Sequence, residues 1–413
     1  MSRKNNLDTY GDIYSDENYD PSINRRGKKK KKKSGVRALP VVLCIIFSIV
    51  VAAVCYGVWV IKFHKADQST SLMGDGAKVT ETDEYGNVIE KDVIVNENSY
   101  NFLVVARDQA SGLTDVMMIV NYNIDDQSVA IMQLPRDTYV EVEDHSYHKL
   151  NGVFSYFYNQ YEYGTKDREL KALDNFADFL TENLYIEIHY SAYMDLDGFG
   201  DIVDAVGGVE MYVPQNMYYE DRNQGLYINL REGWQTLDGD KAEQFVRYRS
   251  GYATADIGRQ DAQKIFMTAF IDKVTGSLNL NNLDKLTNLA TTVSDSIRTN
   301  LSVNDIVYFG KYFVGLGGKE KVNLKNVVMV TMPGRAFSYY GSYYSMNKES
   351  VVNIIDEYFN IYNFSVKGYF DKNTVFLPDD SDDASAIYNK PAEEFKTNIY
   401  NADEIDQDGI AIH

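Results

Sequence analysis

The chain has very little cysteine, and this absence removes several kinds of chemistry. Only two cysteines occur among its 413 residues, Cys44 and Cys55, and both lie in the same apolar run. The rest of the chain therefore has no disulfide, whatever the redox state of its compartment. It also has no thiolate nucleophile and no cysteine-based zinc site.

Positive charge is scarce outside the N-terminus. Residues 1–37 hold eleven Lys or Arg and five Asp or Glu, a net charge of +6; because the whole chain carries −19, the remainder carries −25. So acidic a bulk repels the phosphates of a nucleic acid, which excludes nucleic acid as a partner. The sequence also lacks a Walker-type glycine-rich loop and a Ser/His/Asp pattern.

One long uncharged run predicts a membrane anchor. Residues 38–61 contain no charged side chain, and at about 1.5 Å per residue a helix of this length crosses a bilayer. Arg25, Arg26 and six lysines at 28–33 precede the run, so the positive-inside rule predicts a cytoplasmic N-terminus and an extracellular bulk. A cleaved signal peptide is the alternative, but the basic region and the apolar run are both too long for one.

The remaining organisation follows from composition and periodicity. We expect a basic cytoplasmic tail at 1–37, a polar stalk at 62–96, a folded domain at 97–360, and an extension at 361–413 that ends in a mobile acidic tail. Strand-type and helical segments alternate in the domain, which predicts the α/β class with a mixed central sheet flanked by helices. The strand-type runs are 101–106, 116–122, 128–134, 185–193, 209–213 and 326–331. The helical runs are 166–184, 196–206, 238–248, 256–274, 283–297, 303–316 and 348–359.

A pair of carboxylates is the first candidate for chemistry. Asp108 follows one strand-type run and Asp115 precedes the next. Carboxylates that meet at neighbouring strand ends can share one Mg²⁺, with water and phosphate oxygens completing its shell. A chance acidic pair in a loop is the alternative.

Arginines supply the second and third candidates. Arg136 precedes Asp137 at a strand end, which is either a surface ion pair or a guanidinium placed to bind two phosphate oxygens. Arg247 and Arg249 are two residues apart, a spacing that shares a face in an extended segment but not in a helix. Both can contact one ligand only if the predicted helix ends there, and the nearby Gly251 favours such an end.

The fourth candidate is a polar stripe at the start of a helix. Asp256, Arg259 and Gln263 have spacings of three and four, so they share a helical face. The first turns of a helix favour an anion, although a capping Asp with an exposed polar stripe is the alternative. Together the four clusters fit a metal-assisted site for a polyphosphate group.

Six motifs in order carry a family resemblance. They are NFLVVARDQASGLTDVMMIV, LPRDTYV, HKLNGVF, MDLDGFGDIVDAVGGVEMYVP, GWQTLDGDKAEQFVRYR and ADIGRQDAQ. This series resembles the LytR–CpsA–Psr family over residues 97–275, and more faintly to about residue 360.

The resemblance implies a mixed sheet with a hydrophobic groove for a polyprenyl chain. It implies Mg²⁺, with Mn²⁺ as an alternative, at Asp108 and Asp115. It implies a catalytic pyrophosphate site made of Arg136, Arg247, Arg249, Asp256, Arg259 and Gln263. The implied enzyme is a phosphotransferase that moves a teichoic acid or capsular glycan from an undecaprenyl-pyrophosphate carrier to peptidoglycan.

Two positions depart from the family pattern. Leu113 and Ala262 stand where the family usually has arginine, and Arg107 could replace one of these charges. These departures keep two alternatives open: a noncatalytic, membrane-tethered binder or regulator of lipid-linked glycans, and an extracellular polyprenyl pyrophosphatase. The sequence also leaves open the glycan, the acceptor hydroxyl, the general base and the oligomeric state.

Two further patterns have ordinary explanations. Tyrosines within 156–163 could form a sugar-stacking platform, although core and sheet-surface positions are commoner for such residues. Asp144, His145 and His148 resemble half of a zinc site, but without a further ligand nearby a chance spacing is favoured.

Overall fold

The computed structural model describes most of the chain after residue 63. The described residues are 64–68, 72–74, 76–82, 85–107, 113–143, 146–222, 226–252, 256–277, 283–370, 375–378, 381–395, 397 and 399–404. They all belong to one compact unit, residues 56–413. The predicted basic tail and membrane segment lie outside them, and within them no helix is both long and apolar enough to cross a bilayer.

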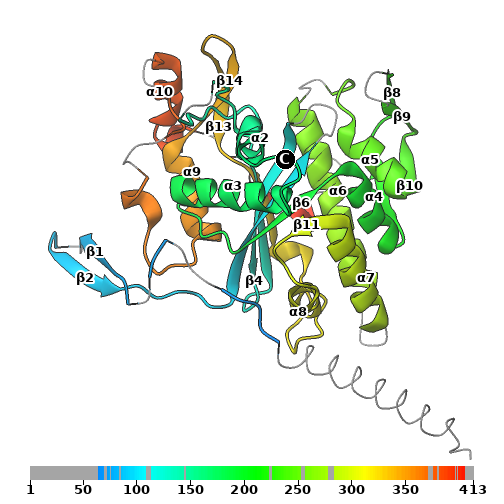
Figure 1. Cartoon of the computed structure of the whole chain (residues 1–413), viewed down its shortest axis with the longest axis horizontal. Helices are drawn as coiled ribbons and strands as arrows, with labels where there is room; N and C mark the ends of the chain where they lie inside the picture. Colours follow the sequence, from blue (N-terminus) through cyan, green and yellow to red (C-terminus); the bar gives the residue numbers. More distant parts are fainter. Residues whose placement is uncertain are drawn as a thin grey trace, which may run out of the picture. The chain divides into compact units, whose positions relative to one another are not determined.

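A seven-stranded sheet forms the centre of this unit (Figure 1). In spatial order its strands are β11 (Ile297–Thr299), β6 (Tyr190–Met194), β3 (Ser99–Arg107), β4 (Thr114–Asn123), β5 (Ser128–Gln133), β12 (Val327–Thr331) and β15 (Ile399–Asn401). The β3–β6 and β5–β12 pairs are parallel and the other neighbours antiparallel. The predicted mixed sheet is therefore confirmed.

Both faces of the sheet are buried, and side chains alternate between them. Leu103 and Met117 belong to the core on one face, whereas Phe102 and Met118 pack into the core on the other. This alternation explains why the strands read as continuous apolar runs.

Helices cover both faces of the sheet. Those that pack on the first face are α2 (Leu150–Gln160), α3 (Arg168–Leu184) and α9 (Lys348–Ile354), which continues as a π-helical turn (Ile355–Phe359). Helices that pack on the second face are α6 (Asp256–Ser277) and α8 (Val303–Phe313).

Further helices and a β-ribbon extend the second face. The helices are α4 (Leu196–Ala205), α5 (Gly239–Arg247) and α7 (Leu283–Ser296). The ribbon strands are β7 (Val209–Val213), β8 (Met217–Asp221), β9 (Leu226–Leu230) and β10 (Gly233–Leu237). Strand β7 pairs with β10 and β8 with β9, all antiparallel. Because β7 leads directly into β8 and β9 into β10, we describe these four strands as one two-stranded ribbon.

The N-terminal part of the described chain differs from the expected stalk. Strands β1 (Lys78–Thr82) and β2 (Val88–Asp92) form an antiparallel pair. The His64 Nε2 atom lies 2.7 Å from Asp305 Oδ1 on α8, and Ala66 is buried. Part of the polar segment at 62–96 therefore packs on the domain, through contacts far apart in the sequence.

The C-terminal extension also differs from the expected mobile tail. Helix α10 (Asp382–Tyr388) packs on the hairpin of β13 (Gly334–Ser338) and β14 (Ser342–Met346). Ala384 and Phe395 are buried, and strand β15 adds to the central sheet beside β12. Acidic composition predicted solvation of this segment, but a few buried apolar side chains and the pairing with β12 order it.

Helices α4 and α5 meet at two glycines. A Cβ atom built on Gly239 would lie 2.6 Å from the backbone oxygen of Gly200. The Gly239 amide donates a hydrogen bond to Asp204 Oδ1 at 2.8 Å. The start of α5 is therefore held on the α4 backbone.

We predict that Gly239→Ala destabilises the fold by about 1–3 kcal/mol, because its methyl group has no room without a shift of α4. Gly276→Ala is the matched control, since a Cβ there would meet nothing within 4 Å. In a helix, that alanine should be neutral or stabilise by up to about 1 kcal/mol. Urea unfolding of the full chain in detergent, followed by circular dichroism, measures both. Equal stabilities for the two variants would show that the close approach is not rigid.

Candidate functional site

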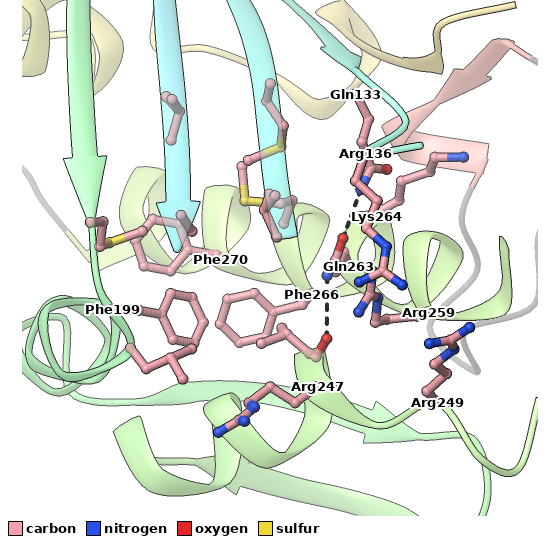
Figure 2. A pocket seen from close by; sticks show the side chains of 18 of the residues that line it. Gln133, Arg136, Phe199, Arg247, Arg249, Arg259, Gln263, Lys264, Phe266 and Phe270 are labelled. Atoms are coloured by element: carbon pink, nitrogen blue, oxygen red, sulfur yellow. Dashed lines mark hydrogen bonds between the residues drawn. The ribbon is translucent and has the colours of Figure 1, made fainter. Parts of the chain in front are cut away.

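A cavity lies between the second face of the sheet and helices α4, α5 and α6 (Figure 2). Its volume is about 690 Å³. Apolar side chains make most of its wall, including Val104, Met118 and Ile131 from the sheet, Phe199 from α4, and Phe266 and Phe270 from α6. Such a wall fits a long apolar group better than a polar one.

Polar side chains line one end of the same cavity. Five of the predicted site residues are among its lining residues: Arg136, Arg247, Arg249, Arg259 and Gln263. Figure 2 shows Arg136, Arg249 and Arg259 toward the same end, whereas Arg247 extends away from them. Apolar walls beside a cluster of guanidinium groups can bind an amphiphile that has an anionic head group.

Arg247 and Arg249 could contact one ligand only if the predicted helix ended between them, and the structure meets this condition. Helix α5 ends at Arg247, and Tyr248 is extended, with φ −62° and ψ 131°. Arg249 therefore lies beyond the helix, and both arginines reach one cavity. The Arg247 Nη1 atom also forms a salt bridge with Glu243 Oε1 at 2.7 Å, which holds this side chain back toward its own helix.

Gln263 joins three elements around the cavity. Its Oε1 atom accepts a hydrogen bond from Gln133 Nε2 at 2.7 Å, and its own Nε2 donates to the Val246 carbonyl oxygen at 3.3 Å. Helix α6 is thereby tied to the end of β5 and to the end of α5. Sequence reasoning missed Gln133, because nothing in a local pattern marks a polar residue at a strand end as the partner of one 130 residues away.

Lys264 is a second lining residue that sequence reasoning missed. Its Nζ atom lies 3.1 Å from Asp261 Oδ1 and 4.4 Å from the centre of the Tyr400 ring on β15. Burial lowers the pKa of Lys264, and the Asp261 carboxylate opposes that shift. The C-terminal strand therefore covers a positive charge in the cavity wall.

Asp115 occupies a β-bulge at the edge of the cavity. Arg107 pairs with Thr114 and Ala106 with Val116, which leaves Asp115 as the extra residue of the bulge. Val116 lines the cavity. A bulge often occurs beside a functional site, so the backbone position of Asp115 is compatible with its predicted role.

The predicted metal ligands stay predictions. Asp108 lies outside the described residues, as do the side chains of Asp115 and Asp256. Among the side chains that are described, no group of three or more His, Cys, Asp or Glu could hold a metal ion. A site made of two aspartates would need phosphate and water oxygens to complete it, which is the usual situation for Mg²⁺.

The two departures from the family pattern lie in different surroundings. Leu113 lines the cavity and adds to its apolar wall. Ala262 is 2% exposed and belongs to the core between α5, α6 and the ribbon. Arg107 was suggested as a replacement for one of the missing arginine charges, but its side chain is not among those that the structure describes.

The zinc-like histidine pattern and the tyrosine pattern each include a side chain that packs against a neighbour. His148 stacks on Tyr139 with ring centres 5.6 Å apart, and residues 144 and 145 lie outside the described ranges. The Tyr158 ring lies 3.9 Å from the Arg168 guanidinium. Both side chains thus serve local packing.

Comparison with known proteins identifies the family. The LytR_cpsA_psr family model, that of the LytR–CpsA–Psr family, matches residues 58–360. The chain therefore belongs to the LytR–CpsA–Psr family, as the order of its motifs predicted.

Two named relatives and one solved structure illustrate the similarity. The polyisoprenyl-teichoic acid–peptidoglycan teichoic acid transferase TagV of Bacillus subtilis (strain 168) is 26% identical over 251 residues, 60% of this chain and 60% of TagV. The cell wall biosynthesis protein LcpA of Corynebacterium glutamicum is 26% identical over 364 residues, 84% of this chain and 65% of LcpA. The match thus spans less than two thirds of either relative. The crystal structure of B. subtilis TagV is 20% identical, covering 67% of this chain and 98% of that one, with a TM-score of 0.47.

We predict that Gln263→Leu destabilises the fold by about 1–3 kcal/mol, because it leaves the buried amide of Gln133 without its acceptor. Removing both amides in a Gln133→Leu, Gln263→Leu double variant should cost less than the sum of the single changes. Urea unfolding of the four proteins gives this coupling energy.

Gln244→Leu, on α5, is the matched control because its Oε1 atom accepts a hydrogen bond from the Asn229 backbone amide on β9 at 2.9 Å, away from the sheet strand that carries Gln133. It should show no coupling with Gln133→Leu. Strict additivity for Gln133 and Gln263 would instead assign the bridge no energetic role.

Proposed function

We propose that this chain is a transferase that moves a glycan phosphate from a polyprenyl-pyrophosphate carrier to a hydroxyl group of peptidoglycan. The observation that carries the proposal is one cavity in which apolar walls adjoin Arg136, Arg249 and Arg259. The names of the relatives TagV, a teichoic acid transferase, and LcpA, a cell wall biosynthesis protein, agree with this proposal. Teichoic acid and capsular polysaccharide are the proposed cargoes.

Each part of the cavity has a counterpart in the proposed donor. The phenylalanines of α4 and α6 would bury isoprene units, which removes apolar surface from water. The guanidinium groups would bind pyrophosphate oxygens two at a time. Because the walls are apolar, each of these ionic contacts is stronger than it would be in water.

The proposed reaction is a displacement at the phosphorus that bears the glycan. The acceptor hydroxyl oxygen forms a bond to that phosphorus, and the bond to the bridging oxygen breaks. The polyprenyl phosphate leaves with the bridging oxygen and its negative charge, which Arg136 and Arg259 would stabilise. The hydroxyl proton passes to a base or to solvent, and Asp256 would either accept it or orient Arg259.

Mg²⁺, with Mn²⁺ as an alternative, is proposed at Asp108 and Asp115. The bulge at Asp115, on the cavity edge, fits such a site. A bound divalent ion would neutralise charge on the pyrophosphate oxygens. Chelation with EDTA should then abolish transfer and Mg²⁺ should restore it. Full activity in EDTA would remove the metal from the proposal.

The proposed location is the cell membrane, with the domain outside the cell. The apolar run at 38–61 and the lysines before it support a single-pass anchor. A polyprenyl carrier resides in the bilayer, so a short polar connection would keep the cavity within its reach.

We predict that Arg136→Ala and Arg259→Ala each lower the transfer rate by a factor of roughly 10²–10³, the usual loss for one preorganised contact to transition-state charge. The assay uses the full chain in detergent with Mg²⁺, a lipid-linked saccharide and wall glycan, and detects the joined product by mass spectrometry. Arg298→Ala is the matched control, since this arginine is exposed on β11 and is not among the residues that line the cavity. Wild-type transfer by both cavity variants would refute the proposed phosphate site.

A noncatalytic binder is the second candidate, because Leu113 gives the cavity an apolar wall where the family usually has arginine. The same assay separates the candidates. Tight donor binding without turnover supports a binder or regulator. Phosphate release that needs no glycan acceptor supports a polyprenyl pyrophosphatase.

A further inference from the structure

The β7–β10 ribbon has two chemically different faces. Its inner face packs into a hydrophobic core through Val213, Met217 and Leu230, which are 0–3% exposed. Its outer face carries aromatic side chains along its whole length. Tyr212 lies directly opposite Trp234 in the β7–β10 register. The ribbon thus presents aromatic rings on the side that has no core to join.

The aromatic side chains are exposed yet ordered in pairs. Trp234 and Tyr227 are each 53% exposed and Tyr218 is 62% exposed. The Tyr212 and Trp234 rings are 6.0 Å apart at 68°, and the Tyr218 and Tyr227 rings 6.1 Å apart at 89°. The chain has two tryptophans, and the one outside the predicted membrane segment is here. Exposed aromatic rings gathered on one face can mark a binding site.

Polar groups alternate with these rings. Asn229 lies opposite Tyr218 and Glu220 opposite Tyr227 in the β8–β9 register, so all four share the outer face. The Asn229 Nδ2 atom lies 3.5 Å from the Tyr227 hydroxyl. Aromatic faces with amide and carboxylate groups between them suit a pyranose chain, which offers apolar C–H faces and a rim of hydroxyl groups.

We propose that the outer face of the ribbon binds a neutral glycan strand, which serves as the acceptor. This inference rests on the proposed function, because only a transferase needs an acceptor beside its donor site. Tyr219 and Leu226, on the same hairpin, line the cavity. Both belong to the inner face of the ribbon, so a glycan strand bound on the outer face would reach the cavity around the edge of this hairpin.

Charge favours a neutral strand over two other occupants. The described residues of the ribbon include Glu210, Glu220, Asp221 and Glu232 against Arg222 and Arg231, a net charge of −2. Arg222 forms a salt bridge with Glu220 at 2.7 Å and Asp221 lies on the inner face, so Glu210 and Glu232 account for the negative charge near the outer rings. This charge repels a phosphate-rich polymer such as the proposed cargo. It also repels the anionic surface of a bilayer, where exposed Trp and Tyr otherwise often reside.

The test measures glycan binding separately from transfer. The probe is chitohexaose, a neutral β-1,4-linked hexamer of N-acetylglucosamine, titrated calorimetrically into the full chain in nanodiscs. Trp234→Ala and the double variant Tyr218→Ala, Tyr227→Ala should each weaken binding about tenfold, the loss expected for an aromatic stacking contact. Trp234→Phe should keep most of the affinity, because it retains an aromatic face.

Tyr340→Ala is the matched control, since Tyr340 is 98% exposed at the turn between β13 and β14. It should bind chitohexaose like the wild type. Unchanged binding by the ribbon variants would overturn the inference. So would a loss caused by Tyr163→Ala, which would place the sugar on the alternative platform near residues 156–163.

The membrane alternative has its own readout. In a Trp59→Phe background, Trp234 fluorescence should be insensitive to brominated lipids in the nanodisc and should change when chitohexaose is added. Quenching by the brominated lipids would assign the ribbon to the bilayer and overturn the inference.

Transfer kinetics distinguish this inference from the proposed function. Ribbon variants should raise the acceptor KM about tenfold, in step with the lost affinity, and leave kcat unchanged. Arg136→Ala should lower kcat and leave chitohexaose binding intact. Normal transfer by Arg136→Ala would refute the proposed phosphate site while the ribbon result stood. Normal acceptor KM in the ribbon variants would refute only the acceptor site.

Discussion

The candidate site depends on how α6 packs against the second face of the sheet. Its first half contributes Ala262 and Phe266 to the core shared with α5 and the ribbon, and its second half contributes Ile271 to the core under α8. Helix α6 therefore joins two cores. Its residues Arg259 and Gln263 line the cavity. Any displacement of α6 would move the apolar wall and the polar end of the cavity together. The packing of α6 therefore determines the shape of the cavity.

Local patterns predicted those parts of the fold that local forces determine. Strands β3, β4 and β5 and helix α6 were predicted within a few residues, because continuous apolar runs and helical periods report burial directly. The condition on Arg247 and Arg249 also came from local geometry, and the end of α5 satisfies it. By contrast, the three-residue strand β15 gains its order from β12, and Gln133 gains its role from a residue 130 positions away. Neither leaves a trace in the neighbouring sequence.

The arrangement of charge separates two classes of ligand. The cavity end gathers guanidinium groups in apolar surroundings, where they attract phosphate most strongly. The outer face of the ribbon carries Glu220, paired with Arg222, among its aromatic rings, and it has no such cluster of arginines for phosphate among its described residues. A chain with a large negative net charge can therefore still present a positively charged cavity end, because Arg136, Arg249 and Arg259 line the same end of the cavity. Composition alone could not predict this, since it averages over the two regions.

The C-terminal strand β15 contacts a charged residue of the cavity wall. Tyr400 on β15 covers the Lys264 ammonium group, and burial lowers the Lys264 pKa while Asp261 opposes the change. A charge in that position is costly without both partners, because desolvation penalises the charged form. The strand at the sheet edge therefore also packs on the side chain of Lys264, which lines the cavity. The described residues of the extension beyond residue 360 therefore belong to the domain that holds the site.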